Sequence, residues 1–259
     1  MTLRVECRDL SVGWSGSALI SNFKLDEAFD ADNDTLPIIG RTGRGKSTLL
    51  YALSGMAQPI GGQISWQFPD EAAPTTWSGE PRSFRTADRL RRRRFGFLLQ
   101  DARLIDCFTV AENLRHTLRL RGVTDNVDGR IDKAVNGMLI EGDDADGFLG
   151  KFPTRLSGGQ RQRMALAAAI AHDPEVLFAD EPTASLDDES GLEILGAIRR
   201  WLDEGKGKRA FVFVTHRVET LYQGIGARKA LELDLPHGDD ARVVARPRTV
   251  GPNGLVATE

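Results

Sequence analysis

The first part of the chain alternates between apolar and polar residues, with short polar turns between the apolar stretches. Alternation over residues 3–12 and 23–30 predicts two antiparallel strands, because successive side chains of a strand point to opposite faces. The apolar run at 35–40 predicts a buried strand, and a glycine-rich loop joins it to a helix predicted over 46–56. This order of strand, loop and helix is typical of the entry into a parallel α/β sheet.

The middle of the chain changes from a sheet pattern to a helical one. Residues 61–68 predict a further strand after a Gly-Gly turn, and the Pro-, Ser-, Thr- and acid-rich residues 69–88 are expected to form an exposed loop. Between residues 101 and 163, apolar residues recur at three- and four-residue spacing, which is the period of amphipathic helices. We therefore expect a helical insert between the strands of the sheet.

The last hundred residues return to the buried-strand pattern. Short apolar runs at 176–180 and 210–216 enclose a predicted helix at 189–205, which completes a βαβ unit. Residues 230–235 and 241–246 predict a closing hairpin around the turn PHGDD. The last dozen residues are expected to form a loose tail.

Composition narrows the classes of protein that fit this pattern. The chain has 259 residues, 41% of them hydrophobic, and a net charge of −3, so no global basic field marks it as a protein that coats nucleic acid. Cys7 and Cys107 belong to no CxxC or Cys/His cluster, which argues against a zinc site or disulfide scaffold and favours a reducing compartment. The most apolar helical run, residues 164–171, is too short to cross a bilayer, and the N-terminus lacks a signal-peptide core. We expect a chain that is neither secreted nor membrane-spanning.

Residues 40–48, GRTGRGKST, match the phosphate-binding pattern GxxxxGK[ST] between a predicted strand and a predicted helix. In such a P-loop the backbone N–H groups surround phosphate oxygens, while Lys46 reaches the β and γ phosphates and the Ser47 hydroxyl binds Mg²⁺. The residues expected to hold the nucleotide here are Gly40, Arg41, Thr42, Gly43, Arg44, Gly45, Lys46, Ser47 and Thr48.

Polar side chains also follow three of the predicted buried strands. Asp180 ends the strand at 176–180, where a carboxylate can hold the metal ion beside the P-loop, and Glu181 follows where it can polarise a water. His216 ends the next strand and can face the γ phosphate, although a strand-end histidine is also common as a plain polar cap. Gln100 follows the strand-like FGFLL, where its amide can touch the metal or the attacking water.

A second candidate phosphate site lies at LSGGQRQR, residues 156–163. Here a turn of small residues runs into an arginine- and alanine-rich helix, and helix N-termini bind anions. The residues of this turn leave open which phosphate the site would bind.

The order of these motifs resembles the ATP-binding cassette (ABC) ATPases over nearly the whole chain. The matching motifs are the P-loop at 40–48, the Q-loop at Gln100, the signature at 156–160, the Walker B strand at 176–181, the D-loop at 184–187 and the switch histidine His216. The resemblance implies an ATPase that binds two Mg²⁺-ATP between two copies arranged head to tail.

The resemblance also implies a role for each motif residue. Glu181 would be the catalytic base, His216 the γ-phosphate switch, and Gln100 the link between the metal site and a membrane partner. Asp187 would lie in the loop that passes between the two subunits. Trp14 would stack on adenine, with an ordinary core tryptophan as the alternative.

The signature residues complete the implied site from the other subunit. Ser157, Gly158, Gly159 and Gln160 would face the γ phosphate that the partner's P-loop holds. The expected ligands of Mg²⁺ are Ser47, Gln100 and Asp180.

The implied fold is an α/β P-loop NTPase core with a mixed sheet, an N-terminal antiparallel β-subdomain and an inserted helical subdomain. We expect one domain over residues 1–259, with the core and the β-subdomain at about 1–100 and 165–240. The helical subdomain would span about 101–164, and a C-terminal tail about 241–259.

A narrower resemblance covers residues 90–114, which look like the same segment of lipoprotein-release, macrolide-efflux and cell-division ABC ATPases. The ABC resemblance of the whole chain implies separate transmembrane permease subunits, a second ATP-binding subunit, and a peripheral position at the cytoplasmic face of the cell membrane. The alternatives are the ATPase of a small-solute importer, a soluble ABC ATPase of cofactor assembly, and a scaffold that binds ATP without hydrolysing it. The arginines at 89 and 91–94 are expected to be a solvated helix end rather than a nucleic-acid site.

Three residues depart from the pattern of the family. Pro37 lies inside the strand before the P-loop, where it removes one ladder donor and predicts a bulge or a shortened pairing. Arg44 stands where small residues are common, and Arg217 stands where the family often has Asp. None of the three removes a catalytic group.

Overall fold

The computed structural model describes residues 2–14, 17–80, 83–101, 104–140, 144–217, 224–234, 244–251 and 254–256. Its strands are β1 (Leu3–Trp14), β2 (Ser17–Phe29), β3 (Thr35–Gly40), β4 (Gly61–Gln67), β5 (Thr75–Ser78), β6 (Phe95–Leu98), β7 (Val176–Asp180), β8 (Ala210–Val214), β9 (Lys229–Asp234), β10 (Val244–Gly251) and β11 (Gly254–Val256). Its helices are α1 (Lys46–Leu53), α2 (Phe84–Arg93), α3 (Val110–Leu120), α4 (Val127–Asn136), α5 (Ala145–Leu149), the short 3-10 turn η2 (Pro153–Arg155), α6 (Gly158–Ile170) and α7 (Asp188–Glu204).

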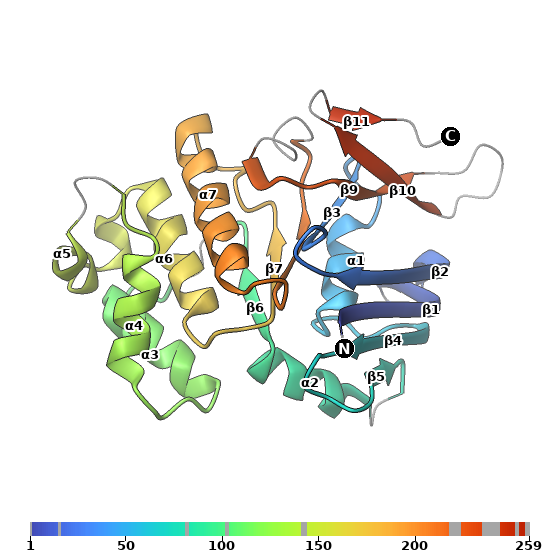
Figure 1. Ribbon diagram of the computed structural model, residues 1–259, viewed down its shortest axis with the longest axis horizontal. Helices are drawn as coiled ribbons and strands as arrows, with labels where there is room; N and C mark the ends of the chain where they lie inside the picture. Colours follow the sequence, from blue (N-terminus) through green and yellow to red (C-terminus); the bar gives the residue numbers. More distant parts are fainter. Residues whose placement is uncertain are drawn as a thin grey trace.

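The strands form two sheets. One is antiparallel, in the order β2-β1-β4-β5, and the other has the order β11-β10-β9-β3-β8-β7-β6. Strands β9, β3, β8, β7 and β6 run parallel, whereas β10 and β11 are antiparallel to their neighbours, so the larger sheet is mixed. The α/β fold with an antiparallel sheet and a mixed sheet is confirmed. Figure 1 shows α3 to α6 gathered at one end of the molecule and the antiparallel sheet with α1 at the other.

The larger sheet separates two hydrophobic cores, because alternate side chains of its strands point to opposite faces. Along β8, Phe211 and Phe213 join the core shared with α3, α4, α6 and α7. Ala210, Val212 and Val214 join the core shared with α1 and the antiparallel sheet. Burial on both faces explains why this strand reads as a continuous apolar run.

Most of the predicted elements are present. The alternating stretches form β1 and β2, and the apolar runs form β3, β7 and β8. The run of helices predicted over 101–163 is present as α3 to α6, and α6 continues to Ile170. The proposed division of the chain near residue 164 therefore falls within a single helix, and that division stays a prediction.

The exposed loop expected at 69–88 is a correction. Residues 75–78 form β5, where Trp77 pairs with Ile64 of β4 and is 2% exposed. Helix α2 begins at Phe84 and buries Ala87 and Leu90. The sequence pattern did not indicate β5 and α2, because each buries only a few side chains and neither contains a run of apolar residues.

The loose tail expected for the last dozen residues is also a correction. Residues 244–251 pair antiparallel with β9, and residues 254–256 pair back on β10. The expected hairpin of β9 with the following strand is confirmed, but its turn PHGDD lies outside the described residues.

Pro37 shortens a pairing without a bulge. The carbonyls of Asp34 and Ile38 accept hydrogen bonds from β8 residues, so the proline nitrogen between them faces β9. Pairing of β3 with β9 begins only at Ile38, whereas pairing with β8 runs unbroken from Thr35. The missing donor therefore falls at a point where the pairing of β3 with β9 has not yet begun.

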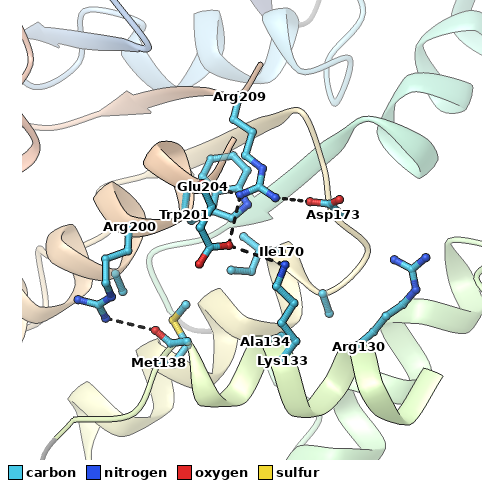
Figure 2. Close-up of a pocket in the computed structure, with 13 residues that line it drawn as sticks. Arg130, Lys133, Ala134, Met138, Ile170, Asp173, Arg200, Trp201, Glu204 and Arg209 are labelled. Carbon is cyan, nitrogen blue, oxygen red and sulfur yellow. Dashed lines mark hydrogen bonds and ion pairs between the residues drawn. The ribbon is translucent and has the colours of Figure 1, made fainter. Parts of the chain in front are cut away.

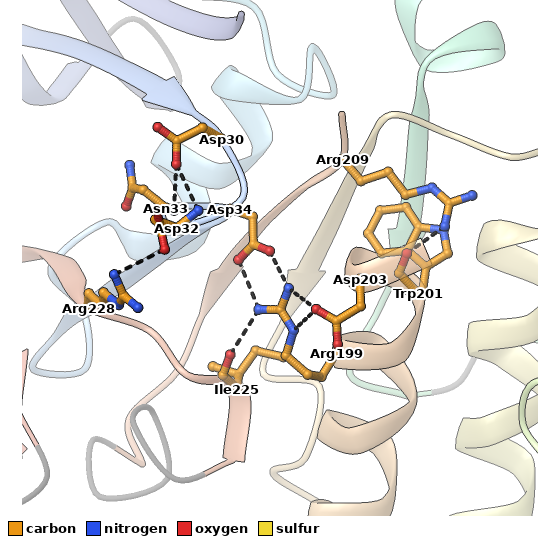
Figure 3. Close-up of polar contacts among 10 residues, drawn as sticks. All are labelled: Asp30, Asp32, Asn33, Asp34, Arg199, Trp201, Asp203, Arg209, Ile225 and Arg228. Carbon is orange, nitrogen blue, oxygen red and sulfur yellow. Dashed lines mark hydrogen bonds and ion pairs between the residues drawn. The ribbon is translucent and has the colours of Figure 1, made fainter. Parts of the chain in front are cut away.

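A buried ion pair ties the start of β3 to α7 (Figure 3). Arg199 Nη1 donates to Asp34 Oδ1 at 3.0 Å, and Nη2 donates to Asp34 Oδ2. Nη2 also lies 2.9 Å from Oδ1 of Asp203. The hydrogen bond to Asp34 raises the pKa of Arg199 above its usual value. The Asp34 side chain is 9% exposed, so the guanidinium supplies hydrogen bonds that water cannot provide there.

We expect Asp34→Ala to lower the free energy of unfolding by about 2 kcal/mol, because it leaves a partly buried guanidinium with Asp203 and the Ile225 carbonyl alone among the described residues. Asp32→Ala is the matched control, since Asp32 and Arg228 are 82% and 65% exposed and 3.4 Å apart. Such an exposed pair contributes less than ~1 kcal/mol. Urea unfolding of both variants measures the difference, and equal losses would contradict this assignment.

His172 makes the fold sensitive to acid. Its ring is 8% exposed, and its Nε2 donates to the carbonyl of Phe95 at 3.2 Å. Burial, with a smaller contribution from Arg121, lowers the pKa of His172 from 6.5 to about 3. Between those values the unfolded chain binds a proton that the folded chain does not, so stability falls as the pH falls from 6.5.

Lowering the pH from 7 to 5 should therefore destabilise the protein by about 2 kcal/mol through His172 alone. His172→Gln removes the titrating group and keeps an amide donor for the Phe95 carbonyl. The loss of stability between the two pH values should be about 2 kcal/mol smaller in this variant. Urea unfolding at both pH values tests this, and an unchanged difference would contradict it.

Candidate functional site

The P-loop leaves the end of β3 and enters α1, and its glycines allow a tight turn. Gly45, at the N-cap of α1, has φ 83°, and a Cβ there would lie 2.8 Å from the Leu19 side chain. Gly43 has φ 77°, and a Cβ there would meet no atom within 4 Å. The loop is therefore wound around open space at a helix N-terminus, a geometry that fits phosphate groups.

Lys46 points back into this loop. Its Nζ donates to the carbonyls of Gly40 and Arg41, at 2.9 and 3.1 Å, and the residue is 9% exposed. The ammonium group is thus held at the P-loop by neutral acceptors, which an anionic phosphate oxygen can replace with a stronger charge-assisted bond.

Asp180 connects the end of β7 to the first turn of α1. Its Oδ1 accepts a hydrogen bond from Ser47 Oγ at 3.0 Å, and its Oδ2 accepts one from the Tyr51 hydroxyl at 2.7 Å. A hydroxyl and a carboxylate oxygen are the hard ligands that Mg²⁺ prefers. Gln100 lines a cavity of about 370 Å³ together with Tyr51 and Asp180. The three residues predicted to hold the metal are therefore close together.

Sequence reasoning missed Tyr51. Its position four residues after Ser47 places both hydroxyls on one face of a helix, which is the local signal that the sequence offers for it. Its hydroxyl fixes the second oxygen of Asp180, so that the carboxylate presents Oδ1 to Ser47.

Glu181 and His216 contact each other at the ends of β7 and β8. His216 Nδ1 lies 2.8 Å from Glu181 Oε2, and the two side chains are 58% and 17% exposed. Glu181 has φ 51°, an uncommon backbone conformation for a residue with a side chain. The turn at Glu181 directs its carboxylate to His216, and the contact joins Oε2 of the glutamate to Nδ1 of the histidine.

Trp14 lies beside the P-loop and outside the core. Its side chain is 59% exposed, and its indole Nε1 donates to Thr48 Oγ1 at 3.1 Å. The core-tryptophan alternative is excluded by this exposure. An exposed indole tied to the P-loop is available to stack on a flat ring.

The signature residues begin α6. Ser157 is the N-cap: its Oγ accepts from the Gln160 N–H at 3.2 Å, and Gln160 Oε1 accepts from the Ser157 N–H at 3.1 Å. A Cβ on Gly158 would meet no atom within 4 Å, so the start of the helix is open above this residue. The arrangement leaves an open helix N-terminus that suits an anion.

Asp187 begins α7 in the same way, beside the signature. Its Oδ1 accepts from the Ser190 N–H at 2.9 Å and its Oδ2 from the Ser190 hydroxyl at 3.0 Å. These bonds lower the pKa of Asp187. A Cβ on Gly159 would lie 2.9 Å from Ser190 Oγ, so Ser190 joins the D-loop to the signature. Sequence reasoning missed Ser190, because a serine three residues after the N-cap is not the Glu or Gln of a capping box.

Arg217 stands where an acid is common in the family, and its side chain contacts the D-loop. Its Nη1 donates to Asp188 Oδ1 at 3.2 Å and its Nη2 to the carbonyl of Leu186 at 3.4 Å. The Arg217 side chain thus links the segment after β8 to the start of α7.

The predicted site residues form two groups within one chain. The P-loop, Asp180, Glu181 and His216 follow the neighbouring parallel strands β3, β7 and β8, and Trp14 at the end of β1 bonds to Thr48 of α1. In Figure 1, α6 and α1 lie in different parts of the molecule, with β7 and α7 between them. The signature therefore lies apart from the P-loop of its own chain. None of the helices in the described ranges has the length and apolar character needed to span a bilayer.

Comparison with known proteins identifies the family. The family model described as ABC transporter matches residues 31–184, more than half of the chain. The lipoprotein-releasing system ATP-binding protein LolD of Wigglesworthia glossinidia brevipalpis is 32% identical over 188 residues, which cover 73% of this chain and 76% of LolD. The sulfate/thiosulfate import ATP-binding protein CysA 1 of Agrobacterium fabrum is 36% identical over 188 residues, covering 72% of this chain but 49% of CysA 1.

A solved structure shows the same fold. The ATP-binding cassette MJ0796, dimeric and bound to ADP and phosphate after hydrolysis, matches with a TM-score of 0.70 at 24% identity, over 95% of this chain and 98% of that one. The match of the family model and the relatives above agree with the P-loop, Walker B and signature geometry. The chain belongs to the ABC transporter family, as an ATP-binding subunit with ATPase activity.

Proposed function

We propose that this chain hydrolyses Mg²⁺-ATP at the interface of two cassettes arranged head to tail, and that closure of this dimer drives separate transmembrane subunits. The observation that carries the proposal is the separation of the P-loop from the signature, each of which presents a helix N-terminus to anions. Two copies would bring these halves together twice. ATP would then stabilise the closed dimer because only that state contacts it from both sides.

In the proposed site each residue has one task. The P-loop and Lys46 bind the phosphates, and Trp14 covers the base. Ser47 and Asp180, already 3.0 Å apart, would hold Mg²⁺, with Gln100 at the edge of the same cavity. The ion would neutralise charge that develops on the phosphate oxygens.

Glu181 would accept the proton of the attacking water. Its carboxylate bonds to Nδ1 of His216, which leaves Nε2 of the histidine to contact the γ phosphate. Ser157 and the start of α6 from the partner cassette would complete the binding of that phosphate, and Asp187 would pass between the two subunits.

A groove beside Gln100 fits the contact with a membrane partner. A cavity of about 350 Å³ lies between β6 and α3, and Ile105 and Leu120 on its edge are 39% and 61% exposed. An apolar groove next to the metal site would let a permease helix respond to nucleotide. We propose that the chain is held peripherally at the cytoplasmic face of the membrane through this contact.

Among the subfamilies we favour lipoprotein or lipid extraction, efflux or mechanotransmission. The resemblance of residues 90–114 to lipoprotein-release, efflux and cell-division ATPases supports this choice, and LolD is 32% identical over 76% of its own length. Small-solute import is the second candidate, supported by the 36% identity to CysA 1. A soluble cofactor-assembly ATPase is the third, and no nucleic-acid partner is proposed.

Affinity capture of the tagged chain from native membranes tests the partner. We expect an integral membrane protein to co-purify, and its substrate-binding part would distinguish extraction from import. Leu120→Glu, at the exposed edge of the groove, should abolish the association, whereas Leu192→Glu on α7, also exposed at 52%, should not. Recovery of soluble partners alone would support the assembly ATPase and contradict the proposal.

Mixed dimers test the shared site. A chain with Ser157→Arg keeps its own P-loop, and a chain with Lys46→Ala keeps its own signature. Mixing the two should give one site with both defects and one intact site, so hydrolysis should partly recover relative to either pure variant. If each site instead used a P-loop and a signature from the same chain, neither chain would hold an intact site and mixing would restore nothing.

A further inference from the structure

A second cavity lies away from the nucleotide site, between α4, the end of α6 and α7 (Figure 2). We call it the α4–α7 cavity; its volume is about 260 Å³. Its apolar wall consists of Ala134, Met138, Ile170, Ala171, Ala197 and Trp201. None of its lining residues belongs to the P-loop, the signature, the D-loop or the residues that end β7 and β8.

The charges around the α4–α7 cavity do not balance. Arg209 lies 3.8 Å from Glu204, pairs with Asp173 and stacks over the Trp201 ring at 5.0 Å. Lys133 also lies 3.8 Å from Glu204, so two cations share this one carboxylate. Figure 2 shows Lys133 and Arg209 meeting at Glu204 from opposite sides.

Arg200 carries the surplus charge. Its Nη2 donates to the carbonyl of Gly137 at 3.2 Å, and no carboxylate of the described residues pairs with it. Arg130, the remaining cation of the wall, pairs with Asp125, which does not line the cavity. Three cations thus face two carboxylates across an apolar surface, which leaves one uncompensated positive charge.

The wall also contains an unsatisfied donor. Trp201 is 5% exposed, and its indole Nε1 makes no hydrogen bond with the residues that the structure describes. A buried N–H without an acceptor is uncommon in proteins. An apolar wall, a surplus cation and an orphan donor together suit a small molecule with an apolar body and an acceptor.

We propose that the α4–α7 cavity binds a small organic monoanion, with its apolar body against Met138, Ala197 and Trp201 and its acidic group between Lys133 and Arg200. The volume is just below the ~300 Å³ at which ligand pockets commonly begin, so the ligand is smaller than a nucleotide. Because Lys133 comes from α4 and Arg200 from α7, the ligand bridges the helical insert and the sheet-covering helix.

The position of the α4–α7 cavity gives such a ligand a route to the ATPase site. Helices α6 and α7 line it near their C-terminal ends, through Ile170 and through Trp201. The N-termini of these two helices carry Ser157 and Asp187. A ligand that favours one arrangement of the helices therefore changes ATP turnover by linkage. This second step rests on the proposed function, whereas binding itself does not.

Binding is tested with 8-anilinonaphthalene-1-sulfonate, an aromatic monoanion whose fluorescence rises in apolar surroundings. N-phenyl-1-naphthylamine has the same body without the sulfonate and is the matched neutral probe. Titration of the full chain in saturating ADP should show one site that prefers the anion. Lys133→Gln/Arg200→Gln should weaken anion binding roughly tenfold and leave binding of the neutral probe unchanged.

Two further variants keep the binding experiment decisive. Arg119→Gln removes an exposed cation of α3 outside the cavity and should not change the affinity. Lys24→Ala removes an exposed lysine of β2 and should not change it either, and saturating ADP occupies the P-loop, which separates this site from it. Equal affinity for both probes would overturn the proposal. An unchanged affinity for the anion in the Lys133→Gln/Arg200→Gln variant would overturn it as well.

ATP turnover of the full chain tests the linkage. The sulfonate probe should change the turnover of the wild-type chain and have about tenfold less potency on the Lys133→Gln/Arg200→Gln variant. Binding at the cavity without any change in turnover would overturn the regulatory step. A chain that does not hydrolyse ATP at all would instead contradict the proposed function and leave the binding result standing.

Discussion

Glu181→Gln should reduce ATP hydrolysis by roughly 10²- to 10⁴-fold while ATP binding is retained, since this is the range that a positioned general base contributes. Glutamine has nearly the same shape, and its amide can still bond to His216, whose Nδ1 lies 2.8 Å from the carboxylate. It cannot accept the proton of the attacking water. Phosphate release measures the loss, and calorimetric titration with ATP measures the retained affinity.

Glu189→Gln is the matched control for this substitution. Glu189 is an exposed carboxylate in the first turn of α7, eight positions further along the chain. Its neutralisation should leave hydrolysis unchanged. Undiminished phosphate release by Glu181→Gln would refute its assignment as the base, and loss of ATP affinity in that variant would show that the carboxylate acts in binding instead.

The pattern of apolar residues predicted the elements whose burial is either continuous or regularly alternating along the chain. Strand β8 is buried on both faces and reads as a continuous apolar run, while β1 and β2 alternate. Strand β5 was missed because its place depends on a partner: Trp77 is buried only by pairing with Ile64 of β4. The hairpin of β10 and β11 was missed for the same reason, since its strands are defined by pairing that begins at β9.

The candidate site divides in a similar way. The spacing within GRTGRGKST predicts the P-loop, because local backbone geometry determines its shape. The bond of Ser47 to Asp180 joins residues 133 positions apart, and only the order of parallel strands brings them together. Tyr51 and Ser190 were missed although each lies at helical spacing from a predicted residue. Hydroxyl groups are common on helices, so such spacing alone does not distinguish them.

Lys46→Ala should weaken ATP binding roughly 10- to 100-fold, the equivalent of one hydrogen bond to a charged group. The 9% exposed ammonium group lies between the carbonyls of Gly40 and Arg41, so the variant removes a positive charge from the phosphate site with little loss of packing. Lys24→Ala, whose side chain is 77% exposed, is the control for loss of a lysine elsewhere. Calorimetric titration with ATP should show a defect only in the first variant.

Arg44 makes this experiment more informative than it would be with a small residue at that position. Arg44 adds a second cation to the P-loop, and its Nε is buried without a hydrogen bond to any described residue. If Arg44 also binds phosphate, Arg44→Ser should weaken ATP binding by itself, and the double variant should bind ATP more weakly than either single variant. If Arg44 only packs against the loop, the double variant should bind ATP like Lys46→Ala. ATP affinity of the four chains therefore separates the contribution of Lys46 from that of the arginine beside it.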